Sequence, residues 1–378
     1  MSESTNRSGV AGVGLVGAGN ISDQYLSNLT RFPDVEVRFV ADLLTDRAAA
    51  QAQAYGVAAS GTVDELLSRD DIEVVLNLTT PASHTEVGHQ AVAAGKHVWS
   101  EKPLALDHDG GAALLAAAEA AGLRVACAPD TVLGAGLQTG LRAIARGDIG
   151  EPLTATTMFH VPGPEAWHPN PSFLYGHGAG PLFDMGPYYV TTLVHALGPA
   201  TRVHAVSSRS HATRTVGSGP LAGQEFDVQV PTHHAALIEF DGGRSAQSVF
   251  SFQHALARAG LVEINGTEGT IVLPDPNTFG GDSTLWRPGQ DGPTVLPAEG
   301  AEYGRGAGVV DLVRSIRAGE TERASGAVAS HVLDVLLAIR DSAAGGAAVD
   351  VASTVDAIAP LPEGWDPTVA TLGVSAVV

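Results

Sequence analysis

The first third of the chain alternates apolar runs with segments of helical periodicity. The apolar runs predict five strands, at residues 12–16, 35–41, 72–78, 97–100 and 124–127. Apolar residues at helical spacing predict helices after residue 20 and at residues 45–55, 64–68, 84–94 and 110–121. Strands that alternate with helices are typical of βαβ units around a parallel sheet. Residues 1–128 are therefore predicted to form an α/β domain of the doubly wound type.

A glycine-rich turn joins the first strand to the first helix. Gly17 permits the tight turn, and Gly19 lacks a Cβ, so the backbone can approach a pyrophosphate held at the start of the helix. Asn20 and Ile21 follow in the same turn, and Ser22 occupies the third position of the motif, where glycine is usual. Because this turn lies between a strand and a helix, it predicts a Rossmann dinucleotide-binding domain.

An acidic residue ends the second predicted strand, at the distance that the dinucleotide-binding motif requires. Asp42 can accept hydrogen bonds from the ribose hydroxyls of an adenosine. The additional phosphate of NADP would meet like charge here, and Leu43 and Leu44 supply no arginine to offset it. The sequence therefore predicts NAD, and not NADP, as the cofactor.

The charge balance restricts the partners of the protein. The formal net charge is -20, and such a surface repels nucleic-acid phosphates and anionic lipid, so we expect neither partner and favour neutral substrates. No apolar run is long enough to span a bilayer. Cys127 is the only cysteine, which excludes an internal disulfide, and residues 1–9 lack the apolar segment of a signal peptide. These features predict a cytoplasmic protein.

After residue 128 the pattern changes to a succession of strands. A helical segment at residues 133–145 is followed by strand-like runs at residues 153–160, 201–207, 233–240, 246–252 and 261–264. Turns rich in proline and glycine separate them, and an amphipathic helix is predicted at residues 328–343. Residues 129–378 are therefore predicted to form a second domain, with the last helix packing back on the body of the protein.

Four motifs resemble those of the Gfo/Idh/MocA oxidoreductases, the relatives of glucose-fructose oxidoreductase and inositol dehydrogenase. They are TPASH at 80–84, AGKHVWSEKP at 94–103, GAGPLFDMGPYY at 178–189 and INGTEGT at 264–270. The resemblance implies that the second domain is α+β, with a large, open, mainly antiparallel sheet. One face of that sheet would line the site for a sugar or polyol, and the back would make subunit contacts. A homo-oligomer, dimer or tetramer, is the implied assembly.

The resemblance also points to catalytic residues. Lys102 follows a strand of the first domain, at the carboxyl edge where doubly wound sheets place their ligands. Asp184 and Tyr188 are four residues apart at the start of a predicted helix, so their side chains share one face. We interpret Tyr188 as the general acid and base, Lys102 as its electrostatic partner, and Asp184 as the hydrogen-bond acceptor that orients them.

In the pattern of the family that the chain resembles, the position of Tyr188 is most often histidine. An unperturbed phenol has a pKa of about 10, so it needs a nearby cation to act as a base at neutral pH. The alternative is that Lys102 is the base and Tyr188 only shapes the pocket. Lys96 and Lys102 are the only lysines in the sequence, and an ammonium group can release its proton where a guanidinium cannot.

Further residues are expected along the cofactor and the substrate. The resemblance implies cofactor contacts from Thr79, Thr80, Pro81, His84, Glu101 and Lys102, and a cis bond between Lys102 and Pro103. Trp167 and His168 lie in a proline-rich loop and are predicted to offer an aromatic and a polar face to a sugar. A packing role for Trp167 is the alternative.

The 14 histidines raise the question of a metal site. His233 and His234 are adjacent in a predicted strand, where neighbouring side chains point to opposite faces. No spacing typical of metal ligands stands out elsewhere, so we predict no metal.

These features predict an NAD(H)-dependent oxidoreductase that transfers a hydride between the nicotinamide and a secondary alcohol of a sugar, glycoside or cyclitol. One alternative is an enzyme of the same fold that retains NAD and cleaves glycosidic bonds. Another is a non-catalytic sensor of sugar or NAD. The presence of Lys102, Asp184 and Tyr188 together argues against the sensor, which would not need them.

Overall fold

Two large sheets organise the chain, each in a unit of its own. The computed structural model describes residues 9–373. Of these residues, unit 1 contains 9–134, 299–330 and 361–373, and unit 2 contains 135–298 and 331–360. The sequence analysis divides the chain once, into residues 1–128 and 129–378. In the structure, two later segments return to unit 1.

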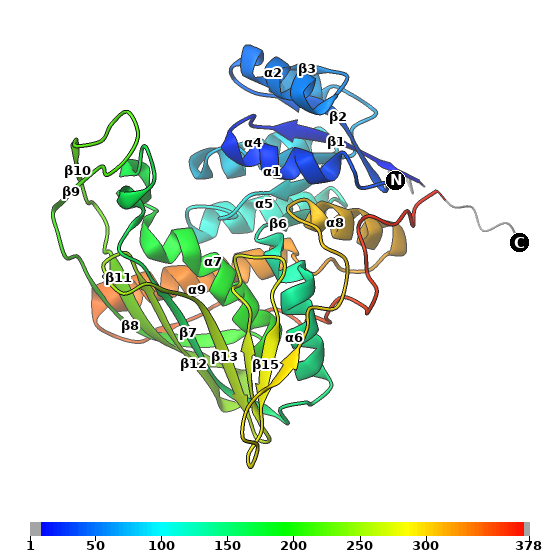
Figure 1. Cartoon of the computed structure of the whole chain (residues 1–378). Helices are drawn as coiled ribbons and strands as arrows, with labels where there is room; N and C mark the ends of the chain where they lie inside the picture. The colour runs from blue at the N-terminus through cyan, green and yellow to red at the C-terminus, as the bar shows by residue number, and fades with distance from the viewer. Residues whose placement is uncertain (1–8, 374–378) are drawn as a thin grey trace, which may run out of the picture. The chain divides into compact units, whose positions relative to one another are not determined.

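Unit 1 is built on a parallel sheet of six strands (Figure 1). Its order is β3-β2-β1-β4-β5-β6, which is the order of dinucleotide-binding folds, with the crevice for the ligand where β1 and β4 meet. The strands are β1 (Ala11–Val16), β2 (Val35–Ala41), β3 (Ser60–Gly61), β4 (Val74–Asn77), β5 (His97–Ser100) and β6 (Val125–Cys127).

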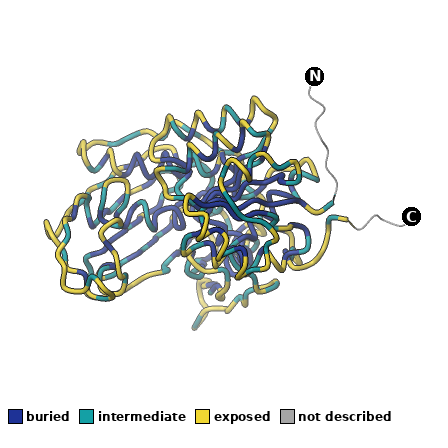
Figure 2. Tube along the Cα trace, turned by 90° about the horizontal axis from the view of Figure 1, so that it is seen from above, coloured by how far each residue is buried: buried dark blue, intermediate teal, exposed yellow. Residues whose placement is uncertain are grey.

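Helices cover both faces of this sheet because alternate strand residues point to opposite sides. Leu15, Leu76 and Trp99 belong to one hydrophobic core, with α1 (Asn20–Leu29), α2 (Thr45–Tyr55) and α8 (Ala307–Ala318). Val16, Val75 and Val98 belong to the other, with α3 (Val63–Leu67), α4 (His84–Ala93) and α5 (His108–Ala120). The strands are buried almost throughout, as the dark blue traces in Figure 2 show.

Distant segments of unit 1 meet at the buried carboxylate of Asp34. It accepts hydrogen bonds from the backbone N–H groups of Thr371 and Leu372, at 2.9 and 2.8 Å, and from the Arg314 guanidinium at 2.8 Å. Burial alone would raise the pKa of Asp34, but these hydrogen bonds outweigh it and lower the pKa. The segment after Leu361 is therefore tied to the start of the β2 strand.

Unit 2 contains a mixed, mostly antiparallel sheet of nine strands, in the order β16-β15-β14-β13-β7-β12-β11-β8-β17. Within this sheet, as far as the described residues go, β7 and β12 are the one pair that runs parallel. The strands are β7 (Pro152–His160), β8 (Ala200–Ser208), β11 (His233–Phe240), β12 (Arg244–Ser251), β13 (Arg258–Gly266), β14 (Thr270–Leu273), β15 (Ser283–Trp286), β16 (Thr294–Leu296) and β17 (Val349–Asp350). A separate hairpin pairs β9 (Thr213–Thr215) with β10 (Glu225–Asp227).

One face of the nine-stranded sheet is covered by α7 (Gly180–Leu197). Tyr189 of this helix packs on Phe159 of β7 and Phe250 of β12, with ring centroids 6.2 and 5.7 Å apart, and its hydroxyl accepts a hydrogen bond from the Gly260 N–H at 2.8 Å. At Gly186, a Cβ would lie 2.5 Å from the Leu336 side chain of α9 (Gly326–Gly345). This close approach fixes the rotation of α7 about its own axis.

The predicted fold class is confirmed: a doubly wound parallel sheet and a larger, mainly antiparallel one. Four elements have the predicted bounds, namely β2, α2, β5 and β11. The helix expected at 133–145 is a 3-10 turn over Asp130–Leu133 followed by α6 (Ala135–Ala145), because Gly134 separates the two. The last predicted helix, 328–343, is α9. No helix within residues 9–373 has the length and apolar character needed to cross a membrane.

Candidate functional site

The glycine turn after β1 has the conformation that dinucleotide binding requires. Gly17 has a φ of 102°, and a Cβ there would lie 2.7 Å from the carbonyl of Leu78, so only glycine fits. A Cβ on Gly19, in contrast, would meet nothing within 4 Å. Open space at Gly19 is what a pyrophosphate needs in order to reach the backbone at the start of α1. Ser22 is buried and donates a hydrogen bond from its hydroxyl to the Gly19 carbonyl at 2.6 Å.

Asp42 ends β2 beside this turn. Its two carboxylate oxygens accept hydrogen bonds from the N–H groups of Ala18 and Leu44, each at 2.8 Å. Asp42 thus ties the glycine turn to the end of β2. The guanidinium of Arg47, in the first turn of α2, lies 4.0 Å from the carboxylate. This arginine stands five residues after Asp42, beyond Leu43 and Leu44, and was not among the predicted site residues.

The loop after β4 lies at the same edge of the sheet. The Thr79 hydroxyl donates to the side-chain oxygen of Asn77 at 2.7 Å, and the amide of Asn77 donates to the carbonyl of His84 at 3.0 Å. Thr80 and Pro81 are exposed. These bonds shape the loop and leave Thr80 and Pro81 open to a ligand at the edge.

His84 joins two loops. Its ring is buried, with Nδ1 2.6 Å from the carbonyl oxygen of Pro103 and Nε2 3.1 Å from that of Thr79. Burial lowers the pKa of His84, although the two carbonyls oppose this shift. The expected cofactor contact of His84 stays a prediction. In the structure the side chain lies between the Thr79 loop and the Lys102–Pro103 bond. This bond is cis, as the resemblance implied.

Glu101 is buried next to Lys102, and its carboxylate is turned into unit 1. One oxygen accepts a hydrogen bond from the Tyr25 hydroxyl at 2.8 Å, and the other accepts from the backbone N–H of Lys102 at 3.0 Å. The guanidinium Nη1 of Arg305 lies 3.8 Å from a carboxylate oxygen of Glu101 and 3.8 Å from one of Asp130. The network therefore holds the backbone of Lys102 in place at the carboxyl edge. Direct contact of Glu101 with the cofactor stays a prediction.

Asp130 is the second buried acid of this network. It accepts hydrogen bonds from the N–H groups of Gly306, at 2.7 Å, and Gly308, at 3.3 Å, where α8 begins. Burial raises the pKa of Asp130 to about 6, against the opposing effect of Arg305. Tyr25, Asp130 and Arg305 were not predicted from the sequence, because they come from three distant segments and belong to no motif.

Asp184 and Tyr188 lie one turn apart on α7, as predicted from their spacing. Asp184 is half-buried and Tyr188 is buried. Tyr189, which anchors α7 to the sheet, points about 100° away from Tyr188 around the helix. The packing of Tyr189 and Gly186 thus determines which way Asp184 and Tyr188 face.

Trp167 and His168 lie in the loop between β7 and α7. Trp167 is 68% exposed, and its ring makes an edge contact with His168, whose ring contacts Phe173 in turn. Such exposure does not fit the alternative of a tryptophan packed for stability. Contact of this aromatic group with a sugar stays a prediction.

Comparison with known proteins identifies the family. Residues 11–128 match the model of an oxidoreductase family with an NAD-binding Rossmann fold, and residues 138–272 match the Gfo/Idh/MocA C-terminal domain. The chain belongs to the Gfo/Idh/MocA family. It is an oxidoreductase with NAD as its cofactor.

Two curated relatives and one solved structure illustrate the similarity. The chain is 28% identical to 1,5-anhydro-D-fructose reductase of Ensifer adhaerens over 76% of this chain and 83% of that protein. It is 31% identical to inositol 2-dehydrogenase 3 of Saccharopolyspora erythraea, over 71% and 74%. Levoglucosan dehydrogenase in complex with NADH and L-sorbose has the same fold, with a TM-score of 0.79 and 22% identity over 91% of this chain and 100% of that one.

The residues at the edge of unit 1 fit NAD. Gly17 and Gly19 provide the turn and the open space for a pyrophosphate, with Asn20 and Ile21 starting the helix behind it. Asp42 stands at the end of β2, where the adenosine ribose is recognised in this fold. Among the described residues, no group of three or more histidine, cysteine or acidic side chains is arranged to hold a metal.

The first prediction concerns cofactor choice. Asp42→Ala should weaken NAD binding and narrow the preference for NAD over NADP by about tenfold or more, since the like charge is lost and Arg47 stays to meet the 2′-phosphate. Adding Arg47→Ala should remove the gain for NADP, whereas Arg47→Ala alone should leave NAD affinity unchanged. Calorimetric titration of both cofactors measures this. Equal affinities in the unaltered protein would contradict the role given to Asp42.

The second prediction concerns Asp130 and pH. Its pKa is about 6 in the folded protein and near 4 in an unfolded chain, so protonation favours the folded state. This contribution, about 3 kcal/mol for a shift of about two units, is complete below pH 4 and lost as the pH rises through 6. Asp130→Asn should remove the loss of stability between pH 4 and pH 6. Asp46→Asn, at an exposed residue, is the control and should leave this loss unchanged. Urea unfolding at several pH values from 4 to 7 measures the free energy of unfolding. If this free energy depends on pH in Asp130→Asn as it does in the unaltered protein, the assignment is refuted.

Proposed function

We propose that this protein transfers a hydride between NAD and a secondary alcohol of a neutral sugar, glycoside or cyclitol. The observation that carries the proposal is the position of Lys102, whose backbone is held by Glu101 and by the His84–Pro103 contact at the sheet edge that carries the glycine turn. The names of the two curated relatives, a reductase of an anhydro sugar and an inositol dehydrogenase, support this substrate class.

In the proposed reaction, Tyr188 accepts the proton of the substrate hydroxyl. Lys102 is the electrostatic partner of Tyr188 in this step, and Asp184 accepts the hydrogen bond that orients the reacting groups. When bound, NAD supplies the acceptor for the hydride that leaves the same carbon. The products of oxidation are a carbonyl compound, reduced cofactor and a proton on Tyr188, which returns to solvent. Reduction uses the same groups in reverse.

The third prediction tests Lys102 and Tyr188 as a pair. Lys102→Ala and Tyr188→Phe should each reduce turnover by about a hundredfold or more, with little change in NAD affinity. The double variant should be hardly worse than the worse single one, because each residue depends on the other. Tyr188→His should keep partial activity with an optimum nearer to neutral pH. The assay is NAD reduction over a panel of sugars, inositols and glycosides.

Two results would decide against this assignment. Tyr188→Phe with nearly unaltered turnover would leave Lys102 as the sole base. No reduction of NAD with any alcohol in the panel would argue against the substrate class. Cleavage of a glycoside without release of NADH would instead favour the glycoside-cleaving alternative.

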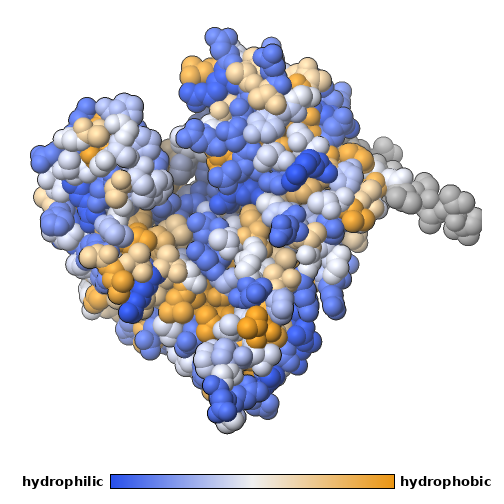
Figure 3. All heavy atoms as spheres, in the orientation of Figure 1, coloured by the Kyte–Doolittle hydropathy of each residue, from blue (hydrophilic) through white to orange (hydrophobic). Residues whose placement is uncertain are grey.

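We also propose that the protein is a homo-oligomer, formed through the face of the nine-stranded sheet away from α7. A row of five apolar residues crosses five neighbouring strands in register: Val206, Ala235, Val249, Met158 and Leu261. Val206 is 66% exposed. Figure 3 shows hydrophobic residues gathered over the part of the molecule where Figure 1 draws these strands. Contiguous apolar surface of this kind is typical of subunit interfaces.

The fourth prediction follows from this row. The double substitution Val206→Glu and Met158→Glu should convert the oligomer to a monomer, because charges would be buried without partners in the interface. Val10→Glu, at an exposed residue of unit 1, is the matched control and should leave the assembly intact. Light scattering at micromolar concentration measures the mass. A monomeric unaltered protein would contradict the proposal.

We also propose that the protein is located in the cytoplasm. Cys127 is buried, and burial raises the pKa of its thiol well above the usual value. The neutral thiol is therefore protected from oxidation and disulfide exchange. A protein that needs no disulfide suits a reducing compartment.

A further inference from the structure

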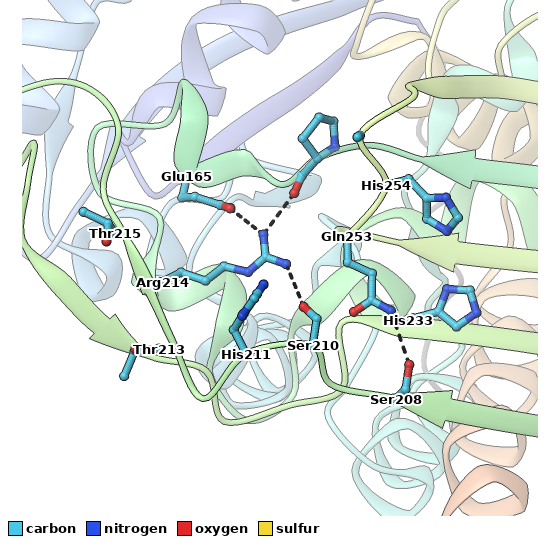
Figure 4. A pocket seen from close by; sticks show the side chains of 12 residues that line it. Glu165, Ser208, Ser210, His211, Thr213, Arg214, Thr215, His233, Gln253 and His254 are labelled. Carbon is cyan, nitrogen blue, oxygen red and sulfur yellow. Dashed lines mark hydrogen bonds and ion pairs between the residues drawn. The ribbon is translucent and has the colours of Figure 1, made fainter.

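Unit 2 contains a pocket that the proposed chemistry does not use. It lies at one end of the nine-stranded sheet, where β8 ends and β11 begins, beside the β9 strand and the loop after β7 (Figure 4). Its volume is about 880 Å³, in the upper part of the range of about 300–1,000 Å³ for small-molecule sites. The pocket is therefore large enough for a ligand of more than one ring.

An arginine and a glutamate form one wall. Arg214 of β9 donates hydrogen bonds to the Glu165 carboxylate and, at 2.9 Å, to the carbonyl of Pro162. The Tyr175 hydroxyl donates to the same carboxylate, and the Arg214 guanidinium stacks 5.3 Å from the Tyr175 ring. Both charged side chains are largely buried, 8% and 17% exposed. The wall is therefore held rigidly, and its two charges cancel.

Histidines form a second wall. His233 and His254 line this wall, with ring centroids 5.8 Å apart. Burial lowers the pKa of His233, and the neighbouring His254 adds to the shift. A lowered pKa favours the neutral ring of His233, which offers one donor and one acceptor. His160, which does not line the pocket, stacks on His254 with centroids 3.8 Å apart and planes 10° apart. A flat stack of this kind presents a face to the apolar side of a sugar ring.

Hydroxyl and amide groups complete the lining. Ser208, Ser210, Thr213 and Thr215 bring hydroxyls, and Gln253 brings an amide whose nitrogen lies 3.3 Å from the Ser208 hydroxyl. The lining thus combines many donors and acceptors with no net charge. An anion would meet Glu165, and an apolar ligand would leave these polar groups without partners.

We propose that this pocket binds a neutral carbohydrate of at least two rings. The ligand hydroxyls bond to the Arg214–Glu165 pair and to the serine and threonine side chains, and one ring stacks on His254. The loop that carries Glu165 continues to Gly180, where α7 begins and leads to Asp184 and Tyr188. The ligand is therefore either the distal part of the substrate, which rests on the proposed function, or a separate carbohydrate.

The first experiment measures binding alone. Maltose, cellobiose and trehalose are titrated into the full chain without NAD, by calorimetry and saturation-transfer NMR, and at least one should bind with a Kd of about 1 mM or below. Thr213→Trp, which fills the pocket at an exposed strand position, should weaken binding at least tenfold. Thr294→Trp, at an exposed residue of β16 outside the pocket, is the control. No binding by any of the three, or equal binding by Thr213→Trp, would overturn the proposal.

A second variant tests the ligand class. Glu165→Gln keeps the shape of the wall but leaves the charge of Arg214 uncompensated. It should bind the disaccharide about tenfold more weakly and gain affinity for glucuronate. Unchanged selectivity between the neutral and the acidic sugar would refute the role of the pair.

Measurements of turnover distinguish whether the ligand is the distal part of the substrate or a separate carbohydrate. If the pocket holds the distal part of the substrate, Thr213→Trp should raise KM for a disaccharide at least tenfold and leave KM for its monosaccharide unchanged. If the carbohydrate is separate, both KM values should stay the same while the binding is lost. If the protein binds maltose in the pocket but reduces no NAD, this inference stands and the proposed function is contradicted. If it reduces NAD with a sugar but binds no disaccharide in the pocket, the proposed function stands and this inference is contradicted.

Discussion

The carboxylate of Glu101 is buried in unit 1, where it accepts hydrogen bonds from the Tyr25 hydroxyl and from the backbone N–H of Lys102. A buried charge needs such partners, since an unpaired carboxylate would be costly away from water. Tyr25 comes from α1, which begins at the glycine turn, and Arg305 comes from the segment before α8. The same carboxylate therefore links the cofactor turn, the Lys102 backbone and α8. Rigid positions of this kind are what hydride transfer demands of the protein.

In unit 2, close packing of side chains holds the proposed catalytic residues in place, whereas in unit 1 buried charged groups do so. The α7 helix contacts the sheet through the Tyr189 ring and contacts α9 at Gly186, where no Cβ would fit without displacing Leu336. The contacts of Tyr189 and Gly186 therefore set the position of the helix that carries Asp184 and Tyr188.

The sequence predicted the fold class because its strongest signals are local. The apolar run of β2 and the periodicity of α2 are long, and both elements have the predicted bounds. The strands β14 to β17 and the β9–β10 hairpin were missed, because runs of two to four residues carry little periodicity. The α8 helix was missed because glycines at 304, 306 and 308 surround its start.

The site was predictable only where a motif covers it. Gly17 and Asp42 follow from their positions after strands. Arg47 was also accessible from the sequence, since it stands in the first turn of the next helix. Tyr25, Asp130 and Arg305 meet only through tertiary packing, and no spacing along the chain indicates that they do.

The path of the chain between the units has a consequence for synthesis on the ribosome. The last strand of the unit 1 sheet is complete at Cys127, but Val309 and Val310 of its core, and the Thr371 and Leu372 groups that bind Asp34, come only after most of unit 2. At about 5–20 residues per second, this interval is on the order of ten seconds or more. During it, the Trp99 face of the sheet lacks its α8 cover. Until the later segments emerge, the nascent first unit therefore exposes apolar residues that the complete protein buries.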